Sequence, residues 1–330
     1  MYIKKKSYLC TVKELINYIS SRLADLYGND ESLALAWWIL EELTGCTRSQ
    51  LQFGYKGTKN IPNYQTIDKI IVRLRQNEPV QYIFGHTLWC GLDLRVSPAT
   101  LIPRPETAEL VETISNCFKQ PQTTLDYPVR VLDIGTGSGC IAIALKKLHP
   151  EWQVTGMDIS ADAVAVAREN ARRNNVEVSF LQADIFSDET EETFAFRLSP
   201  FTLIVSNPPY ICESEKSTMR RNVLDYEPSS ALFVPDDDPL LFYRRIVQLF
   251  CRSSIRPSVH SPARNFFFEI NEAYGNEVQK LMREHGCTDI QLIHDIYGKP
   301  RIIQGRMAWQ SRGLLCPRRA LRGRRPSQTV

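Results

Sequence analysis

The chain has 330 residues, of which 43% are hydrophobic and 23% are charged, and this composition is that of a globular protein rather than a disordered or fibrous one. The net charge of +3 comes from the C-terminus, where the last twenty residues hold six arginines and no acidic residue, so that residues 1–310 carry −3. The main part of the chain therefore gives no electrostatic indication of a nucleic-acid-binding surface.

The chain shows no sign of membrane insertion or secretion. No apolar run approaches the roughly 18 residues that a membrane span needs. The basic N-terminus turns polar at once and lacks the apolar segment of a signal peptide. The nine cysteines are scattered singly, without a C-x-x-C pair, which argues against a metal site or a disulfide framework. We therefore expect no metal, no membrane partner and a reducing, cytoplasmic location.

Residues 11–78 predict a small helical bundle. A capping box that begins at Thr11 opens the first helix, and residues 28–30 separate this helix from a second one. Another capping box, Thr47-Arg48-Ser49-Gln50, precedes a short helical piece, and a last helix covers about 64–77. Such a bundle could dock a partner or only support the next domain, and the sequence favours neither.

A hairpin and a further helix are expected next. Residues 80–97 alternate around Gly85 and Gly91, which predicts an antiparallel hairpin, with 80–84 extended, between two domains. Pro105 then suits the first position of a helix that runs to about 118. Arg104 and Glu106 flank that helix start, and taken alone they could be a solvated ion pair at a helix cap.

From residue 129 onward strands and helices alternate, which predicts a doubly wound α/β domain. The expected strands cover 129–134, 152–157, 176–182, 201–206, 266–270, 288–294 and 301–309, and the expected helices cover 140–148, 160–173, 239–251 and 274–285. Three stretches are expected to be irregular: an acidic loop at 186–199, a loop at 252–264, and the basic tail from about 311, which we expect to be disordered.

Four strand ends carry groups that could bind a ligand, and in an open parallel sheet ligands bind outside the carboxyl ends of the strands. They are the turn Gly135-Thr136-Gly137-Ser138-Gly139, then Asp158, Asp184 and Asn207. The glycine turn alone fits a dinucleotide, a nucleoside or a tight turn, and its spacing departs from G-x-G-x-x-G at Cys140. Asp158 could accept two ribose hydroxyls or cap the helix after it, and Asp184 could accept an adenine amino group or cap the next turn.

The fourth strand runs into Asn207-Pro208-Pro209-Tyr210, where two prolines cannot continue a strand. The Asn207 side-chain oxygen and the Pro208 carbonyl could accept both hydrogens of a planar NH2 group, and the Tyr210 ring could cover its face. The loop could equally be a proline-rich turn with Tyr210 on the core. Beside a nucleoside cofactor, the amide clamp indicates methyl transfer from S-adenosylmethionine to a planar nitrogen, by positioning and preorganised dipoles.

Over roughly residues 10–309 the chain resembles the release factor glutamine methyltransferases, the HemK/PrmC family. The resemblance rests on a series of motifs in the family's order: NEPVQYIFG (77–85), LIPRPET (101–107), DIGTGSG (133–139), NPPYI (207–211), YEP (226–228) and, more faintly, YGKPR (297–301).

The resemblance implies three parts, namely a helical domain for partner docking (1–78), a β-hairpin linker (79–98) and a seven-stranded Rossmann-like methyltransferase domain (99–310). The basic tail (311–330) is additional to the family's pattern. It implies transfer of a methyl group from S-adenosylmethionine to the side-chain amide nitrogen (N5) of the glutamine in the Gly-Gly-Gln motif of peptide-chain release factors, which modulates translation termination.

The family's site residues carry over by position. The implied cofactor-binding residues are Gly135, Thr136, Gly137, Ser138, Gly139, Asp158, Asp184, Ile185 and Asn207. The implied catalytic and substrate-binding residues are Asn207, Pro208, Pro209 and Tyr210, with Arg104 and Glu106 in a motif near the substrate.

Three other functions stay open at this point. A glutamine methyltransferase of a ribosomal protein would share the Asn-Pro-Pro-Tyr loop, although the form of residues 102–107 favours release factors. An adenine-N6 methyltransferase of nucleic acid would need base flipping and a basic target-recognition region, against the −3 charge of residues 1–310. We therefore expect no direct nucleic-acid binding except through the arginine-rich tail. A binding module without activity would have to retain the intact motifs without using them.

Overall fold

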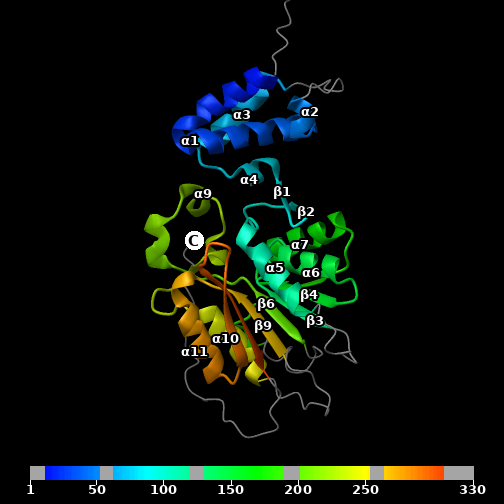
Figure 1. The fold of residues 1–330 in the computed structure, drawn as a ribbon, viewed down its shortest axis with the longest axis vertical. Coiled ribbons are helices and arrows are strands. Elements are labelled where there is room, and N and C mark those ends of the chain that lie inside the picture. Colours follow the sequence, from blue (N-terminus) through cyan, green and yellow to red (C-terminus); the bar gives the residue numbers. More distant parts are fainter. Residues whose placement is uncertain (1–11, 53–61, 119–128, 189–200, 253–263, 308–330) are drawn as a thin grey trace, which may run out of the picture. The chain divides into compact units, whose positions relative to one another are not determined.

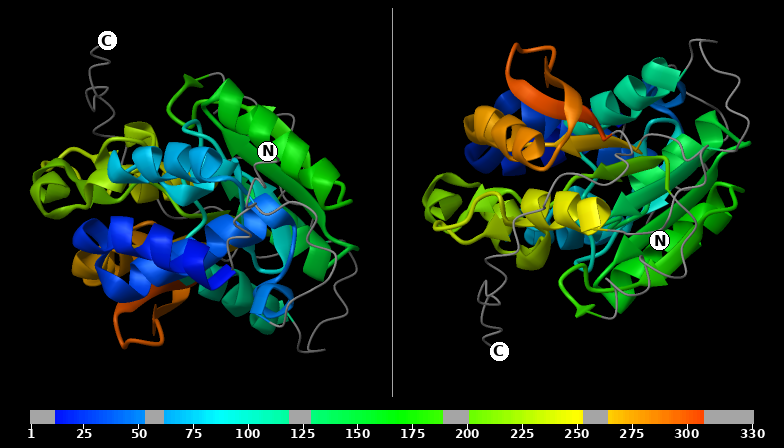
Figure 2. Two further views of the ribbon diagram at one scale, coloured as in Figure 1. Left: turned by 90° about the horizontal axis from the view of Figure 1, so that it is seen from above. Right: turned by 90° about the horizontal axis from the view of Figure 1, so that it is seen from below.

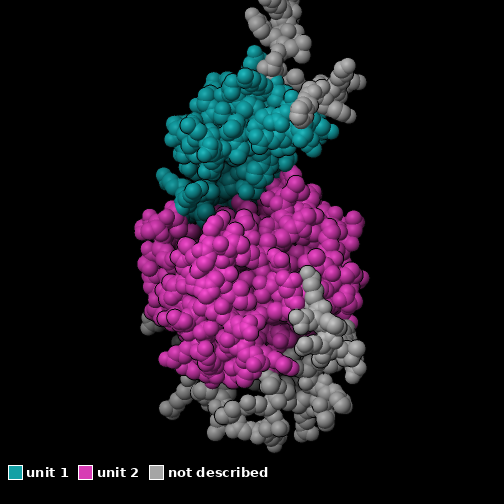
Figure 3. All heavy atoms as spheres, in the orientation of Figure 1, with its two compact units in different colours: residues 1–85, 220–226 teal, residues 86–219, 227–330 magenta. Residues whose placement is uncertain are grey.

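The computed structural model describes residues 12–52, 62–118, 129–188, 201–252 and 264–307. Most of the expected acidic loop at 186–199, nearly all of the loop at 252–264, the tail and the capping residue Thr11 lie outside the described residues. The chain divides into two compact units, residues 1–85 with 220–226 and residues 86–219 with 227–330 (Figure 3). The domain limits expected at 78 and 98 remain predictions.

The first unit is helical, as expected. Its helices are α1 (Val12–Thr44), α2 (Arg48–Gln52), α3 (Tyr64–Arg75), α4 (Val80–Phe84) and α9 (Arg221–Leu224). The predicted break in the first helix is confirmed, because Gly28 has φ 75° and ψ 172° inside α1. The capping box at Thr47 is confirmed as well: Gln50 N donates to Thr47 Oγ1 at 3.3 Å and Thr47 N donates to Gln50 Oε1 at 2.9 Å.

The prediction that residues 80–84 are extended was wrong, because they form the helix α4. Val80, Ile83 and Phe84 all pack on the apolar core of the first unit. Their spacing of three and four residues puts them on one face of a helical turn, and five residues are too few to separate this pattern from an alternating one. Gly85 ends the helix in the left-handed region, with φ 76°.

The second unit is built on a seven-stranded sheet of strand order β10-β11-β9-β6-β3-β4-β5, which confirms the expected doubly wound α/β fold. Its strands are β3 (Arg130–Ile134), β4 (Gln153–Asp158), β5 (Ser179–Gln182), β6 (Leu203–Ser206), β9 (Arg264–Glu269), β10 (Thr288–His294) and β11 (Pro300–Met307). The strands from β9 to β5 in this order are parallel, and β11 pairs antiparallel with both β9 and β10. The hairpin of β10 and β11 lies beside α11 (Gly275–Glu284), as both views in Figure 2 show.

Helices cover both faces of this sheet (Figure 1). On one face lie α5 (Pro105–Phe118), α6 (Cys140–Leu148) and α7 (Ala161–Arg173), and on the other lie α10 (Leu241–Arg252) and α11. Strand β3 shows how the sequence produces this arrangement. Val131 packs in the core under α5, α6 and α7, whereas Leu132 and Ile134 pack in the core under α10 and α11, because successive strand residues point to opposite faces.

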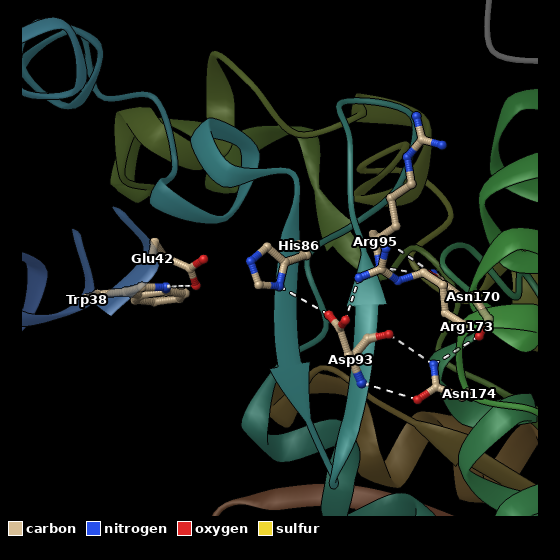
Figure 4. Close-up of polar contacts among 8 residues, drawn as sticks. All are labelled: Trp38, Glu42, His86, Asp93, Arg95, Asn170, Arg173 and Asn174. Carbon is tan, nitrogen blue, oxygen red and sulfur yellow. Dashed lines mark hydrogen bonds and ion pairs between the residues drawn. The ribbon is translucent and has the colours of Figure 1, made fainter. Parts of the chain in front are cut away.

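A two-stranded hairpin, β1 (His86–Trp89) and β2 (Leu92–Arg95), opens the second unit. Asn170 of α7 and Asn174, the C-cap residue of that helix, hold it (Figure 4). Asp93 N donates to Asn174 Oδ1 at 3.2 Å and Asn174 Nδ2 donates to Asp93 O at 2.9 Å. Arg95 N and O make the same pair of bonds with Asn170, at 2.6 and 2.9 Å. Residues four apart on a helix thus match residues two apart on a strand, which ties the hairpin to α7.

Within the described ranges, none of the helices combines the length and the apolar character needed to cross a membrane.

Candidate functional site

The structure brings four of the predicted strand ends to one edge of the sheet. Ile134 of β3 pairs with Met157 of β4 on one side and with Ser206 of β6 on the other. Asp158 of β4 pairs in turn with Gln182 of β5. The glycine turn and the stretches that begin at Asp158, 183 and 207 therefore lie at adjacent carboxyl ends, which is where an open parallel sheet binds ligands.

The turn at 135–139 is held mainly by backbone hydrogen bonds, to β4 and within itself. Gly135 N and Thr136 N both donate to Met157 O at 2.9 Å, and Gly139 N donates to Thr136 O at 2.8 Å. Gly135, Gly137 and Gly139 have φ of 70°, 54° and 80°, which only glycine adopts without strain. A Cβ at Gly139 would lie 3.1 Å from the Ala167 side chain, whereas one at Gly135 or Gly137 would meet no atom within 4 Å. The turn is thus closely packed at its end and open at its start.

Asp158 closes this turn onto the next helix. Its Oδ2 accepts from Gly137 N at 2.9 Å and its Oδ1 accepts from Ser160 N at 2.9 Å. Each carboxylate oxygen has a further lone pair, so these two backbone bonds leave acceptors for hydroxyl groups. The cap of α7 is Ser160 and not Asp158. Asp184 caps its turn, since Oδ1 accepts from Phe186 N at 2.8 Å. The adjoining Ile185 is buried, and its carbonyl accepts from a buried arginine, Arg245, at 2.7 Å.

Two buried polar atoms beside the turn have no hydrogen-bond partner in the part of the chain that the structure describes. They are Asp133 Oδ1 and Ser138 Oγ, while Asp133 Oδ2 accepts from Thr136 Oγ1 at 2.6 Å. Burial raises the pKa of Asp133 to about 7, against the hydrogen bond from Thr136, which lowers it. Buried polar atoms are nearly always paired, so Asp133 Oδ1 and Ser138 Oγ together fit a ligand with amino and hydroxyl groups.

The loop at 207–210 is fixed on both sides. Before it, Ser206 Oγ donates to Ile134 O at 2.6 Å. At its end, the Tyr210 carbonyl accepts from Asn271 Nδ2 at 3.2 Å and Ile211 N donates to Leu232 O at 3.0 Å. The Pro208 carbonyl, by contrast, has no hydrogen-bond donor among the described residues. The loop is therefore rigid, and it keeps an acceptor for another molecule.

Side chains far away in the sequence hold Asn207 and Tyr210. Asn207 Nδ2 donates to Thr107 Oγ1 at 3.1 Å, and Thr107 Oγ1 donates to Glu269 Oε2 at 2.7 Å. Tyr210 Oη donates to Glu269 Oε1 at 3.1 Å. Burial raises the pKa of Glu269, whereas the bonds from Thr107 and Tyr210 and the charge of Arg301 lower it. Burial, and then the Glu269 charge, raise the pKa of Tyr210.

Sequence reasoning missed Glu269 and the role of Thr107. A signal for Glu269 was present, because a carboxylate follows the apolar run Phe266-Phe267-Phe268 directly, as Asn207 follows the strand β6. The register pairs Ser206 with Phe268, which puts Glu269 and Asn207 at neighbouring strand ends. Five strand ends, and not four, thus contribute to this edge.

Arg104 and Glu106 belong to the same motif but contact different residues. Arg104 Nη2 donates to Glu227 Oε1 at 2.6 Å, and Ile102 N donates to Glu227 Oε2 at 3.2 Å. The Glu227 side chain is only 1% exposed, so this ion pair joins the 101–107 motif to the 226–228 motif. Glu106 is half-buried in the first turn of α5, and its charge is one of those that raise the pKa of Glu269.

No group of three or more His, Cys, Asp or Glu side chains is arranged for a metal ion within the described ranges.

The chain is similar to known proteins over most of its length. Residues 14–85 match the PrmC N-terminal domain and residues 114–225 match the methyltransferase small domain. The release factor glutamine methyltransferase of Bacteroides thetaiotaomicron is 42% identical over 286 residues, which are 87% of this chain and 96% of that protein. The one of Flavobacterium psychrophilum is 37% identical over 284 residues, 86% of this chain and 94% of that protein.

Among solved structures, the protein-(glutamine-N5) methyltransferase (release factor-specific) from Alicyclobacillus acidocaldarius is 27% identical and covers 65% of this chain and 99% of that chain. Its TM-score is 0.37, so the sequence relatives, and not this superposition, carry the comparison.

Proposed function

Because the chain belongs to the family of release factor glutamine methyltransferases, we propose that it transfers a methyl group from S-adenosylmethionine to the side-chain amide nitrogen (N5) of a glutamine in peptide-chain release factors. The glutamine is the one in their Gly-Gly-Gln motif, and the reaction takes place in the cytoplasm. The reaction needs a site for a sulfonium nucleoside and, next to it, two acceptors for one NH2 group.

One observation carries the proposal, which is the state of the two acceptors at the end of β6. The amide of Asn207 is held through its nitrogen, which donates to Thr107, so its oxygen remains for another donor. The Pro208 carbonyl is unpaired among the described residues and follows directly in the chain. A primary amide has two N–H groups in one plane, and these two oxygens suit that donor set.

The nucleoside is expected to bind at the adjacent strand ends. Asp158 has lone pairs left for ribose hydroxyls, Asp184 and Ile185 flank the position expected for adenine, and the backbone of 135–139 is open at its start. Asp133 Oδ1 could pair with the amino group of the amino-acid end. When bound, S-adenosylmethionine supplies a methyl group on a positively charged sulfur.

The protein's task is then to make a poor nucleophile react. The lone pair of an amide nitrogen is delocalised into its carbonyl, so the nitrogen attacks weakly. Hydrogen bonds from both N–H groups to Asn207 Oδ1 and the Pro208 carbonyl draw electron density toward the nitrogen and fix its direction. A loop pinned at Ser206 and Tyr210 provides these acceptors without reorganisation.

Transfer of a labelled methyl group from S-adenosylmethionine to a purified release factor tests the proposal. A second sample of the factor, with its Gly-Gly-Gln glutamine changed to alanine, is the matched control. Label on the first and none on the second is the expected result. Equal label on both would move the modified residue elsewhere, and label on neither would contradict the proposed substrate.

A further inference from the structure

We propose that Thr107 and Glu269 are positioning residues, which together fix the direction in which the Asn207 side-chain amide faces its substrate. The inference rests on the proposed function, since it concerns the same acceptor amide. It assigns to two residues outside the loop at 207–210 the task of keeping the Asn207 oxygen, and not its NH2 group, turned toward the glutamine.

The first step concerns Glu269. Against the burial that raises the pKa of its carboxyl, two hydroxyl donors and the Arg301 charge favour the ion, and a carboxylate ion can only accept hydrogen bonds. The residue is 1% exposed, and its oxygens accept from Thr107 Oγ1 at 2.7 Å and from Tyr210 Oη at 3.1 Å. The single hydroxyl hydrogen of Thr107 is therefore committed to Glu269.

The second step concerns Thr107. With its hydrogen committed, the hydroxyl can offer Asn207 only lone pairs. Asn207 must then present its Nδ2, which lies 3.1 Å from Thr107 Oγ1, and the Oδ1 of the same amide is turned away from Thr107. The direction of the Asn207 amide follows from the charge of Glu269 and does not depend on how the amide itself is assigned.

The third step concerns what a reversed amide would do. If Thr107 Oγ1 donated to Asn207 instead, the amide would be stable with its NH2 group toward the substrate. Two NH2 groups would then face each other, and one substrate hydrogen would have no acceptor. An amide rotated in this way costs little in packing, because oxygen and nitrogen are nearly equal in size. Only the polarity of the hydrogen bonds distinguishes the two states.

The two residues come from α5 and β9, which pack against each other although they are far apart in the sequence. Thr107 lies in the first turn of α5 and Glu269 ends β9, 162 residues later. Arg301 opposes the charge of Glu269, and Glu106 adds to its negative surroundings. Burying a carboxylate costs free energy of desolvation. Both donors to Glu269 lie in or contact the loop at 207–210, so orientation of this loop explains the buried charge better than stability alone.

Three variants test the inference. Thr107→Val keeps the shape and removes the hydroxyl, Thr107→Ser keeps the hydroxyl, and Glu269→Gln keeps the shape but adds a donor. We expect Thr107→Val and Glu269→Gln to lower kcat roughly ten- to hundred-fold, since a misdirected acceptor acts on the transition state. The Kd for S-adenosylmethionine should change less than about three-fold. Thr107→Ser should restore most of kcat.

Thr202→Val is the matched control. Thr202 is buried as well, and its Oγ1 accepts from Arg130 N at 2.9 Å, but it lies just before β6, at the opposite end of that strand from Asn207. It should lower the melting temperature and leave kcat unchanged. The double variant Thr107→Val/Glu269→Gln should be no slower than the slower single variant, because both act through one amide.

The outcomes separate this inference from the proposed function. If the unchanged protein does not methylate the release factor, the proposed function fails first. If it does, and both Thr107→Val and Glu269→Gln keep kcat within a factor of two, the positioning role is refuted. A fall in kcat that Thr107→Ser does not restore, or that Thr202→Val reproduces, would refute it too, since stability would then explain the loss.

Discussion

The glycine turn and the Asn-Pro-Pro-Tyr loop lie at neighbouring strand ends but are held in opposite ways. The turn at 135–139 is fixed by backbone bonds to itself and to Met157, and its side-chain partner Asp158 is 21 residues from Gly137. The loop at 207–210 is fixed by side chains 100 and 59 residues away, Thr107 and Glu269. The glycine spacing makes the turn recognisable in the sequence, and its partners lie on the next strand, whereas the loop depends on elements much farther away in the chain.

This difference also separates the expected effects of substitution. Changes at the turn should act on the affinity for the cofactor, because its atoms are the binding groups. Changes at the loop and its supports should act on kcat, because they set the direction of an acceptor. The four predictions that follow test this separation, from the largest expected effect to the smallest.

Asn207→Ala should have the largest effect of the four, and this effect should fall on kcat. It removes the acceptor oxygen, and we expect kcat to fall by about 10²–10³-fold, as for the loss of one oriented group at a reacting centre. The affinity for S-adenosylmethionine, measured by calorimetry, should stay within a few-fold. Unchanged turnover in the labelled-methyl assay would eliminate the amide clamp.

Asp158→Ala should break the turn side. It removes acceptors for the cofactor, and we expect a loss of about 1.5–3 kcal/mol in binding free energy, a roughly ten- to hundred-fold higher Kd. Ser160→Ala is the control, because Ser160 Oγ caps α7 by accepting from Ala163 N at 3.2 Å. The control should cost about 1 kcal/mol of stability and leave Kd unchanged. Equal Kd values for both variants would mean that Asp158 only binds the backbone of Gly137 and Ser160.

Asp133 predicts how stability depends on pH on the turn side. Burial raises its pKa from 3.8 to about 7 in the folded protein. Between these values the folded state binds more protons than the unfolded state, so the free energy of unfolding should fall as pH rises, by at most about 1.4 kcal/mol per pH unit.

Asp133→Asn should reduce that slope in chemical unfolding of the ligand-free protein between pH 4 and 7. Glu269, whose pKa burial also raises, contributes with the same sign in both proteins. Parallel stability profiles for the two proteins would show that Asp133 titrates as an ordinary carboxylate.

Tyr210→Phe should have the smallest effect, and it separates the role of the Tyr210 hydroxyl from that of Thr107. It keeps the ring and removes one of the two hydroxyls that donate to Glu269. We expect a loss of about 1 kcal/mol in stability and a few-fold lower kcat, because Thr107 still directs Asn207. If Tyr210→Phe lowered kcat as much as Thr107→Val, the ring hydroxyl and not the threonine would be the main support of the clamp.

What the sequence predicted correctly was local. The helix expected at 140–148 has those bounds, and Ser160 caps α7 as its position suggested. The break at Gly28 and the capping box at Thr47 are likewise set by residues within one turn of each other. The alternation of strands and helices after 129 was sufficient for the sheet, because buried parallel strands are continuous apolar runs.

The sequence did not predict contacts between distant residues, nor elements too short to show a repeating hydrophobic pattern. Strand β7 (Ile211–Cys212) pairs with β8 (Phe233–Val234), and two residues show no alternation. The residues between β7 and β8 include short helical turns that no sequence pattern predicted. Glu269 stood in no motif, and the sequence did not show that Glu227 of the YEP motif would pair with Arg104 or Glu269 with Thr107.

The bonds that Asn170 and Asn174 make with β2 have a consequence for contacts between copies of the protein. A two-stranded ribbon ordinarily presents one row of open backbone groups on each flank, and such a row invites another chain to extend the sheet. On β2 the groups of Asp93 and Arg95 are already occupied by Asn174 and Asn170, which act as a third strand made of side chains. At these two residues the backbone of the ribbon is closed to edge-to-edge pairing without a proline or a bulge.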